Sequence, residues 1–139
     1  MKVNVGDVIE IKTSKGLVYA LYTHRHPQYG ALLRVLAVRQ GVRFATFFPL
    51  QAAVDRGIVT VAGNTTVPDD LTVFPLFRAG AVDPRSKKVG TWWLWDGERE
   101  WQVGDLTPDQ KRLPIRSVVN DALLVRRIEE GWVPEKDPR

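Results

Sequence analysis

The sequence predicts a mainly β protein of the α+β class: an antiparallel, strongly bent sheet or partly open barrel, with one C-terminal helix packed on it. Two observations favour this fold. Most apolar residues fall in short runs that alternate with polar residues and end at Gly or Pro, as in half-buried strands. Residues 117–131 are the one segment that combines helical spacing of apolar residues with a clear start and stop signal.

Four expected strands follow one another with short connections, which favours an antiparallel meander. They cover residues 5–12, 17–23, 31–38 and 42–48. Residues 24–30 are expected to form a loop because they contain proline and glycine. The Gln40-Gly41 turn joins the last two strands, since glycine supplies the positive φ that a tight hairpin needs.

The middle of the chain is predicted to be less regular. Pro49 fits a first helical position and Gly57 a C-terminal cap, which predicts one or two helical turns between them. A short strand is expected at residues 58–61 and a loop at 63–70. Further strands are predicted at residues 71–77, 90–95 and 99–103, with a loop at 80–88 and a turn at Asp96-Gly97.

The C-terminal helix is expected to begin at Ser117, whose hydroxyl would accept from the N–H groups of the first turn. Gly131 fits its end, and a broad apolar face should pack on the sheet. Residues 1–133 are therefore predicted to form a single domain. Residues 134–139 are expected to be a flexible tail.

The composition is that of a folded globular protein, with 139 residues, 44% of them hydrophobic and 26% charged. The absence of cysteine excludes disulfides, thiolate metal sites and cysteine nucleophiles, and it suits a reducing compartment. No apolar run approaches the roughly 18 residues of a membrane span, and the N-terminus lacks the apolar core of a signal peptide. We therefore expect a cytoplasmic protein without a membrane partner.

The residue types of the chain give little support for a catalytic site. His24 and His26 point to the same face of an extended segment, but a metal site needs at least one further ligand. The chain has no other His and no Cys, and no carboxylate that could complete the site is close in sequence. No serine lies in a Gly-x-Ser-x-Gly setting, and no phosphate-binding glycine loop is present. The sequence predicts a protein that is not an enzyme, with no catalytic residues, metal or cofactor.

Two groups of residues are predicted to bind a partner. Four of the five tryptophans surround the Asp96-Gly97 turn; in a hairpin, Trp93 and Trp95 share one face and Trp92 takes the other, and large aromatics are enriched at the centres of interfaces. The alternative is that all four are core, with the C-terminal helix over the outer face. The tryptophans are Trp92, Trp93, Trp95 and Trp101.

The second group is basic, in a chain of net charge +4. Arg34, Arg39 and Arg43 interleave with apolar residues around the Gln40-Gly41 turn, which suits an acidic protein partner or, alternatively, ordinary solvated strand ends. A nucleic-acid groove would pair the same cations with nearby exposed aromatics. These are Tyr19, Tyr22 and Tyr29.

Residues 5–11, with the following glycine turn and the Leu17–Ala20 strand, resemble the opening of the immunity protein 26 family. Residues 73–83 are similar to that family's strand and short loop, and residues 90–92 to its next Gly-x-Trp strand, so the resemblance spans most of residues 5–95. It implies a mainly β protein without catalytic residues that protects a bacterium by binding and blocking a cognate polymorphic toxin. A small nucleic-acid-binding β-barrel domain remains the alternative.

Overall fold

The computed structural model describes residues 2–36, 41–69, 77–82, 84–87, 89–96, 99–113 and 116–133. In chain order, the elements are β1 (Asp7–Thr13), β2 (Gly16–His26), β3 (Gly30–Leu36), β4 (Val42–Phe48), α1 (Leu50–Asp55), β5 (Thr60–Asn64), β6 (Phe77–Val82), β7 (Val89–Trp95), β8 (Glu100–Val103), the 3-10 turn η2 (Gln110–Arg112) and α2 (Asp121–Glu129).

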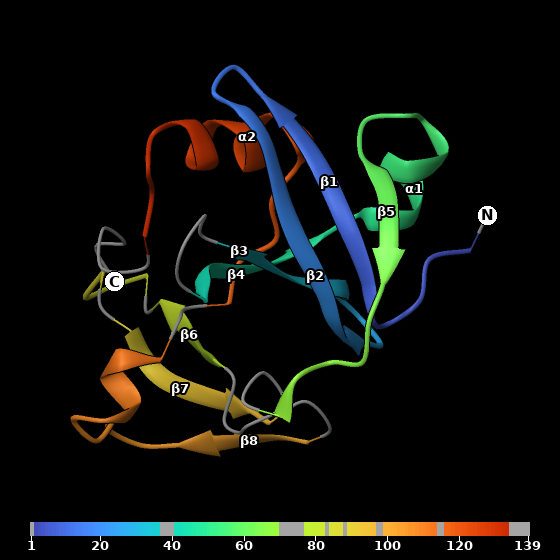
Figure 1. Ribbon diagram of the computed structural model, residues 1–139. Coiled ribbons are helices and arrows are strands. Elements are labelled where there is room, and N and C mark those ends of the chain that lie inside the picture. Colours follow the sequence, from blue (N-terminus) through green and yellow to red (C-terminus); the bar gives the residue numbers. More distant parts are fainter. Residues whose placement is uncertain are drawn as a thin grey trace.

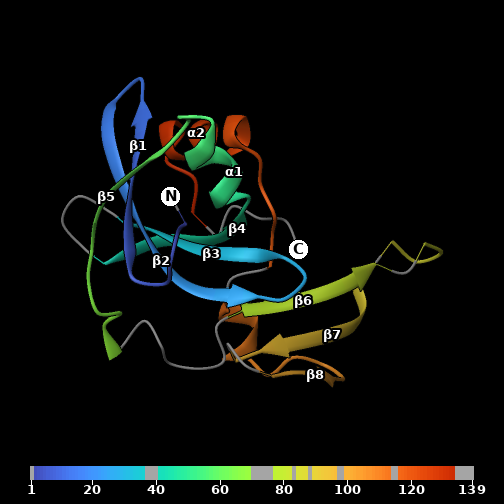
Figure 2. The same ribbon diagram turned by 90° about the vertical axis from the view of Figure 1, so that its right-hand side faces the viewer.

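The strands form two antiparallel sheets. One has five strands in the order β4-β3-β2-β1-β5, and the other has three in the order β6-β7-β8. Both helices lie on one side of the five-stranded sheet and the three-stranded sheet lies on the other (Figure 1, Figure 2). The predicted mainly β, α+β class is confirmed, and the sheets do not close into a barrel. No helix in the described part of the chain is long and apolar enough to cross a membrane.

Strands β1 to β4 form the expected meander, since each pairs antiparallel with the next. However, β2 extends through His26, so the loop expected from residue 24 is wrong for its first three residues. A bulge between Tyr22 and His24 inserts Thr23 as an extra residue and reverses the face of the residues that follow. His24 and His26 thereby share a face with Leu32 and pack toward the second sheet.

The main core lies between the five-stranded sheet and the two helices. The helical turns expected after Pro49 are present as α1, and α2 lies against β1. Both helices contribute buried side chains, which pack with the apolar face of the sheet. The most deeply buried members of this core are Ile9, Ile11, Leu33, Val35, Phe44, Phe48, Leu50 and Leu124.

The helix α2 begins later than the sequence predicts. Asn120 is its N-cap, with the side-chain oxygen accepting from the Leu123 N–H at 2.8 Å. Ser117 has a different role, because its carbonyl accepts from Phe47 N at 2.9 Å and Val119 N donates to the Phe47 carbonyl at 3.0 Å. The segment before the helix therefore extends along the edge of β4, and backbone pairing there excludes a helical start at Ser117.

The remaining boundaries shift by small amounts. β5 starts two residues later than the strand expected at 58 and enters the predicted loop. The strand predicted at 71–77 and the tail at 134–139 lie outside the described residues, apart from Phe77. β6 continues through Gly80, which was expected in a loop. The predicted strands at 90–95 and 99–103 are present as β7 and β8.

Candidate binding surface

The four clustered tryptophans occupy three environments. Trp93 and Trp101 are each 38% exposed, Trp92 is half-buried and Trp95 is buried. The β7–β8 register pairs Trp93 with Gln102 and Trp101 with Leu94, so the two exposed rings lie on opposite faces of the hairpin. The alternative that all four are core is wrong, because α2 packs on the other sheet and leaves two of them exposed.

Trp92 has a structural role on its face of the three-stranded sheet. The Arg78 guanidinium lies 4.7 Å from the centroid of the Trp92 ring, a cation–π contact. Arg78 is itself buried and donates from Nε to the Leu113 carbonyl at 3.0 Å, while its own carbonyl accepts from Arg116 N at 2.8 Å. The segment after β8 therefore covers this face.

Trp95 joins the two sheets. It packs against Leu32 and Phe47 of the five-stranded sheet, with its ring centroid 5.8 Å from that of Phe47. The two histidines of β2 contact the same ring, His26 at 5.3 Å and His24 at 5.9 Å between centroids, both in edge-on geometry. These five residues form the sheet junction. It holds the tryptophan hairpin β7–β8 against the meander.

A chain of polar contacts closes one side of the sheet junction. His26 Nδ1 accepts from the backbone N–H groups of Gln28 at 3.0 Å and Tyr29 at 3.3 Å, which assigns the ring proton to Nε2. Nε2 faces a Glu100 carboxylate oxygen at 3.9 Å, and Glu100 accepts from Arg116 Nη1 at 2.8 Å. The Arg116 guanidinium in turn lies 4.3 Å from the centroid of the Tyr29 ring.

His24 is held as a neutral ring. Arg34 Nε donates to the Thr23 hydroxyl at 3.3 Å, so that hydroxyl can give its own proton to His24 Nδ1 at 3.1 Å. Burial, reinforced by the positive charge of Arg34, lowers the pKa of His24 from 6.5 to about 4. Burial lowers the pKa of His26 as well, with Glu100 opposing the shift. Both rings therefore serve the sheet junction as uncharged aromatic groups at neutral pH.

Stability should consequently depend on pH between 6.5 and about 4. In this range the unfolded chain takes up a proton at His24 that the folded chain does not, so the free energy of unfolding falls as pH falls. In an NMR titration, the His24 Cε1 proton should show a midpoint near 4. Urea unfolding of a His24→Gln variant should show a shallower pH slope than the natural chain. A midpoint near 6.5 would contradict the burial described.

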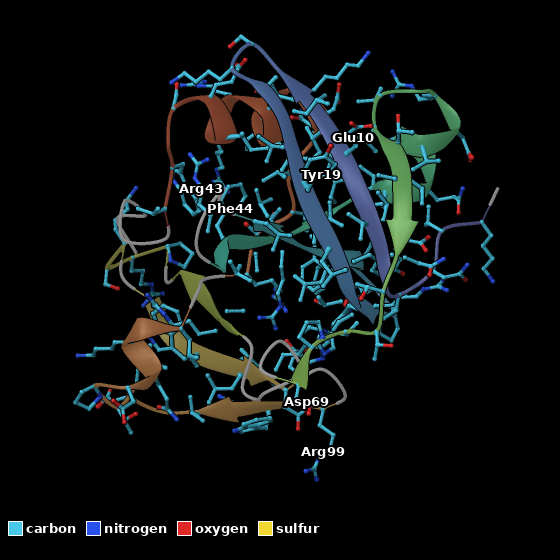
Figure 3. The ribbon with its side chains drawn as sticks, viewed as in Figure 1. Glu10, Tyr19, Arg43, Phe44, Asp69 and Arg99 are labelled. Atoms are coloured by element: carbon cyan, nitrogen blue, oxygen red, sulfur yellow. The ribbon has the colours of Figure 1, made fainter. Side chains whose placement is uncertain are left out.

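The predicted arginines do not share a role. Arg34 is half-buried and bonds Thr23, whereas Arg43 Nη2 donates to the Ile128 carbonyl at 2.8 Å and so satisfies the C-terminal end of α2 (Figure 3). Arg39 lies outside the described residues. Sequence spacing could not reveal the partner of Arg43, because Ile128 lies 85 residues further along the chain.

The three tyrosines likewise do not form one aromatic groove. Tyr19 is 40% exposed and donates to Glu10 at 3.2 Å on the outer face of β1 and β2 (Figure 3). Tyr22 is buried and Tyr29 is covered by Arg116. In the described ranges, no three His, Asp or Glu side chains gather in a way that could hold a metal ion.

No family model matches the chain, and neither a curated protein nor a solved structure matches it. The resemblance to immunity proteins therefore stays a prediction. The features that bear on function are those of the chain itself, above all the two exposed tryptophans and the sheet junction beneath them.

Proposed function

We propose that the chain is a non-catalytic, cytoplasmic binding protein that neutralises a cognate bacterial toxin by direct contact. One observation carries the proposal: Trp93 and Trp101 are each 38% exposed on a hairpin that the buried Trp95 fixes in place. Covering either ring, on the order of 100 Å² of apolar surface, would contribute about 2 kcal/mol to binding. Because the hairpin is already held by the sheet junction, little conformational entropy would be lost.

The position of the hairpin supports the same function. β8 is an edge strand that pairs with β7 in the three-stranded sheet, and its residues are largely exposed. An edge strand can accept a strand of a partner through backbone hydrogen bonds, with alternate side chains contacting each face. Trp101 would flank such a partner strand on one face and Gln102 on the other.

The chemistry of the sheet junction agrees with a non-catalytic role. His26 Nδ1 accepts from two backbone N–H groups, and His24 Nδ1 is engaged with the Thr23 hydroxyl. A general base needs a free lone pair within reach of a substrate proton. The two histidines therefore support the tryptophan hairpin as packing groups.

The proposal predicts that a toxin-like protein is encoded beside this chain, and the absence of such a neighbour would contradict it. Co-expression is expected to rescue cells from that toxin, and calorimetry on the purified pair should give a specific affinity. Trp93→Ala and Trp101→Ala should each weaken binding by about tenfold or more, because each removes an exposed aromatic anchor. Tyr19→Ala is the matched control: Tyr19 is 40% exposed but lies on the other sheet, so its removal should leave the affinity unchanged.

Two results would overturn the proposal. One is a chain that neither binds nor neutralises the neighbouring toxin. The other is binding to single-stranded DNA or RNA with an affinity that falls steeply with salt, as expected of the alternative nucleic-acid-binding function.

A further inference from the structure

A pocket of about 340 Å³ opens where the N-terminal segment, the β2–β3 hairpin and the start of α1 meet. The bulge in β2 builds one of its walls. Tyr22 and Arg25 are three residues apart and would face opposite sides of a regular strand, but the extra residue Thr23 brings both onto one face. They lie opposite Leu33 and Ala31, on the face turned away from the sheet junction. The pocket therefore opens on the opposite face of β2 from the tryptophan hairpin, although Tyr29 lines the pocket and also contacts His26 and Phe47 of the sheet junction.

The floor of the pocket is apolar and the polar groups around it have one sign of charge. Val3, Phe48 and Leu50 are buried and line it. Lys2 and Arg25 line the same space, and both residues are exposed to solvent. None of the described lining residues is acidic. The positive side chains thus favour an anionic ligand over a cationic one. The apolar floor favours a ligand with an apolar body over a fully hydrated ion such as phosphate.

Tyr22 adds a hydrogen-bond donor to the lining of the pocket. The residue is only 5% exposed and lines the pocket, yet its hydroxyl has no hydrogen-bond partner among the described residues. Since this hydroxyl is not one of the fully buried polar atoms left without a partner in the described part of the chain, it is open to the space of the pocket and available to a ligand. Burial raises the pKa of Tyr22 above 10, with Arg25 acting against the shift and Asp7 adding to it, so the hydroxyl remains a donor at neutral pH. The Asp7 carboxylate is engaged elsewhere, accepting from Asn4 N at 2.9 Å.

We infer that this pocket binds a small organic monocarboxylate with an apolar body. The carboxylate lies between Lys2 and Arg25 and accepts from the Tyr22 hydroxyl, while the apolar body rests on Val3 and Phe48. A volume of about 340 Å³ is near the lower end of the roughly 300–1,000 Å³ of ligand pockets, which limits the ligand to a small molecule. The inference is independent of the toxin-binding function.

The experiment is an NMR titration of the isotopically labelled full chain with hexanoate. Hexanoate is expected to shift the backbone resonances of Val3, Tyr22 and Arg25 at millimolar concentration. Hexanamide has the same apolar body without the charge, and it should bind about tenfold more weakly. Arg25→Gln should weaken hexanoate binding by about tenfold, and Tyr22→Phe by about fivefold, since each removes one donor to the carboxylate.

Arg99→Gln provides the matched control. The Arg99 side chain is 85% exposed between β7 and β8, away from the pocket, and its replacement should leave hexanoate binding unchanged. Both test variants should keep the fold, because Arg25 is exposed and Tyr22→Phe retains the buried ring. The inference is overturned if hexanoate and hexanamide bind equally, if Arg25→Gln binds like the natural chain, or if no resonance of the pocket shifts.

Discussion

Replacing Trp95 by alanine is expected to lower the free energy of unfolding by about 3–5 kcal/mol, the range for large aromatic residues removed from a core. Trp95 is 3% exposed and fills the space between the two sheets, where it contacts Phe47, Leu32 and both histidines of β2. Those groups come from strands whose backbones are already paired, so they cannot collapse into the space that the indole leaves. A cavity with polar edges would remain, which increases the loss.

The measurement is urea unfolding followed by circular dichroism, because tryptophan fluorescence would change with the substitution itself. Trp93→Ala is the matched control: it removes the same side chain from the same face of the same strand, but from a position that is 38% exposed. Its loss should be about 1 kcal/mol or less. Equal losses for the two variants would show that Trp95 does not join the sheets.

Replacing Gly6 by alanine should cost about 3 kcal/mol or more. A Cβ at this position would lie 2.5 Å from the backbone oxygen of Thr65, and the residue has a φ of +100°, which side chains disfavour. The backbone cannot move away, since Gly6 N donates to the Tyr22 carbonyl at 2.7 Å and Thr65 N donates to the Gly6 carbonyl at 2.8 Å. The clash thus adds to the conformational strain.

Gly16 separates these two contributions. Its φ of +108° is nearly the same, but a Cβ there would meet no atom within 4 Å. Gly16→Ala should therefore cost about 1–2 kcal/mol from the backbone conformation alone. Thermal or urea unfolding of both variants gives the difference directly. If Gly6→Ala were no more destabilising than Gly16→Ala, the close approach of the Thr65 backbone to Gly6 would be contradicted.

Local sequence patterns were sufficient for the elements whose signals are local. Alternating apolar residues predicted the meander, and the Asp96-Gly97 turn predicted the β7–β8 hairpin. The bulge at Thr23 had no local signal, because contacts on the two faces of β2 stabilise it. One face packs in the main core and the other packs against the three-stranded sheet. The helix start was missed for a similar reason, since Ser117 pairs with β4.

For the candidate surface, too, the sequence predicted the features with local signals and missed those that depend on distant contacts. Alternation along β7 correctly placed Trp93 and Trp95 on one face, but it could not say which of them is buried. That depends on which part of the face the five-stranded sheet covers, and covering residues such as Phe47 are distant in the sequence. Glu100 and Arg116 were missed altogether, because the contact of Glu100 with His26 and its ion pair with Arg116 join residues that are distant along the chain.

The pairing of β4 with the segment before α2 has a consequence for how the chain folds. Thr46 bonds Ser117, 71 residues later, and α2 then completes the core over β1 and β4. Closing so long a loop costs entropy before the contacts that it permits are made, which makes such topologies slow to fold. During synthesis the edge of β4 and its neighbour Phe44 therefore stay uncovered until the last helix is made. The nascent chain is most prone to aggregation in that interval.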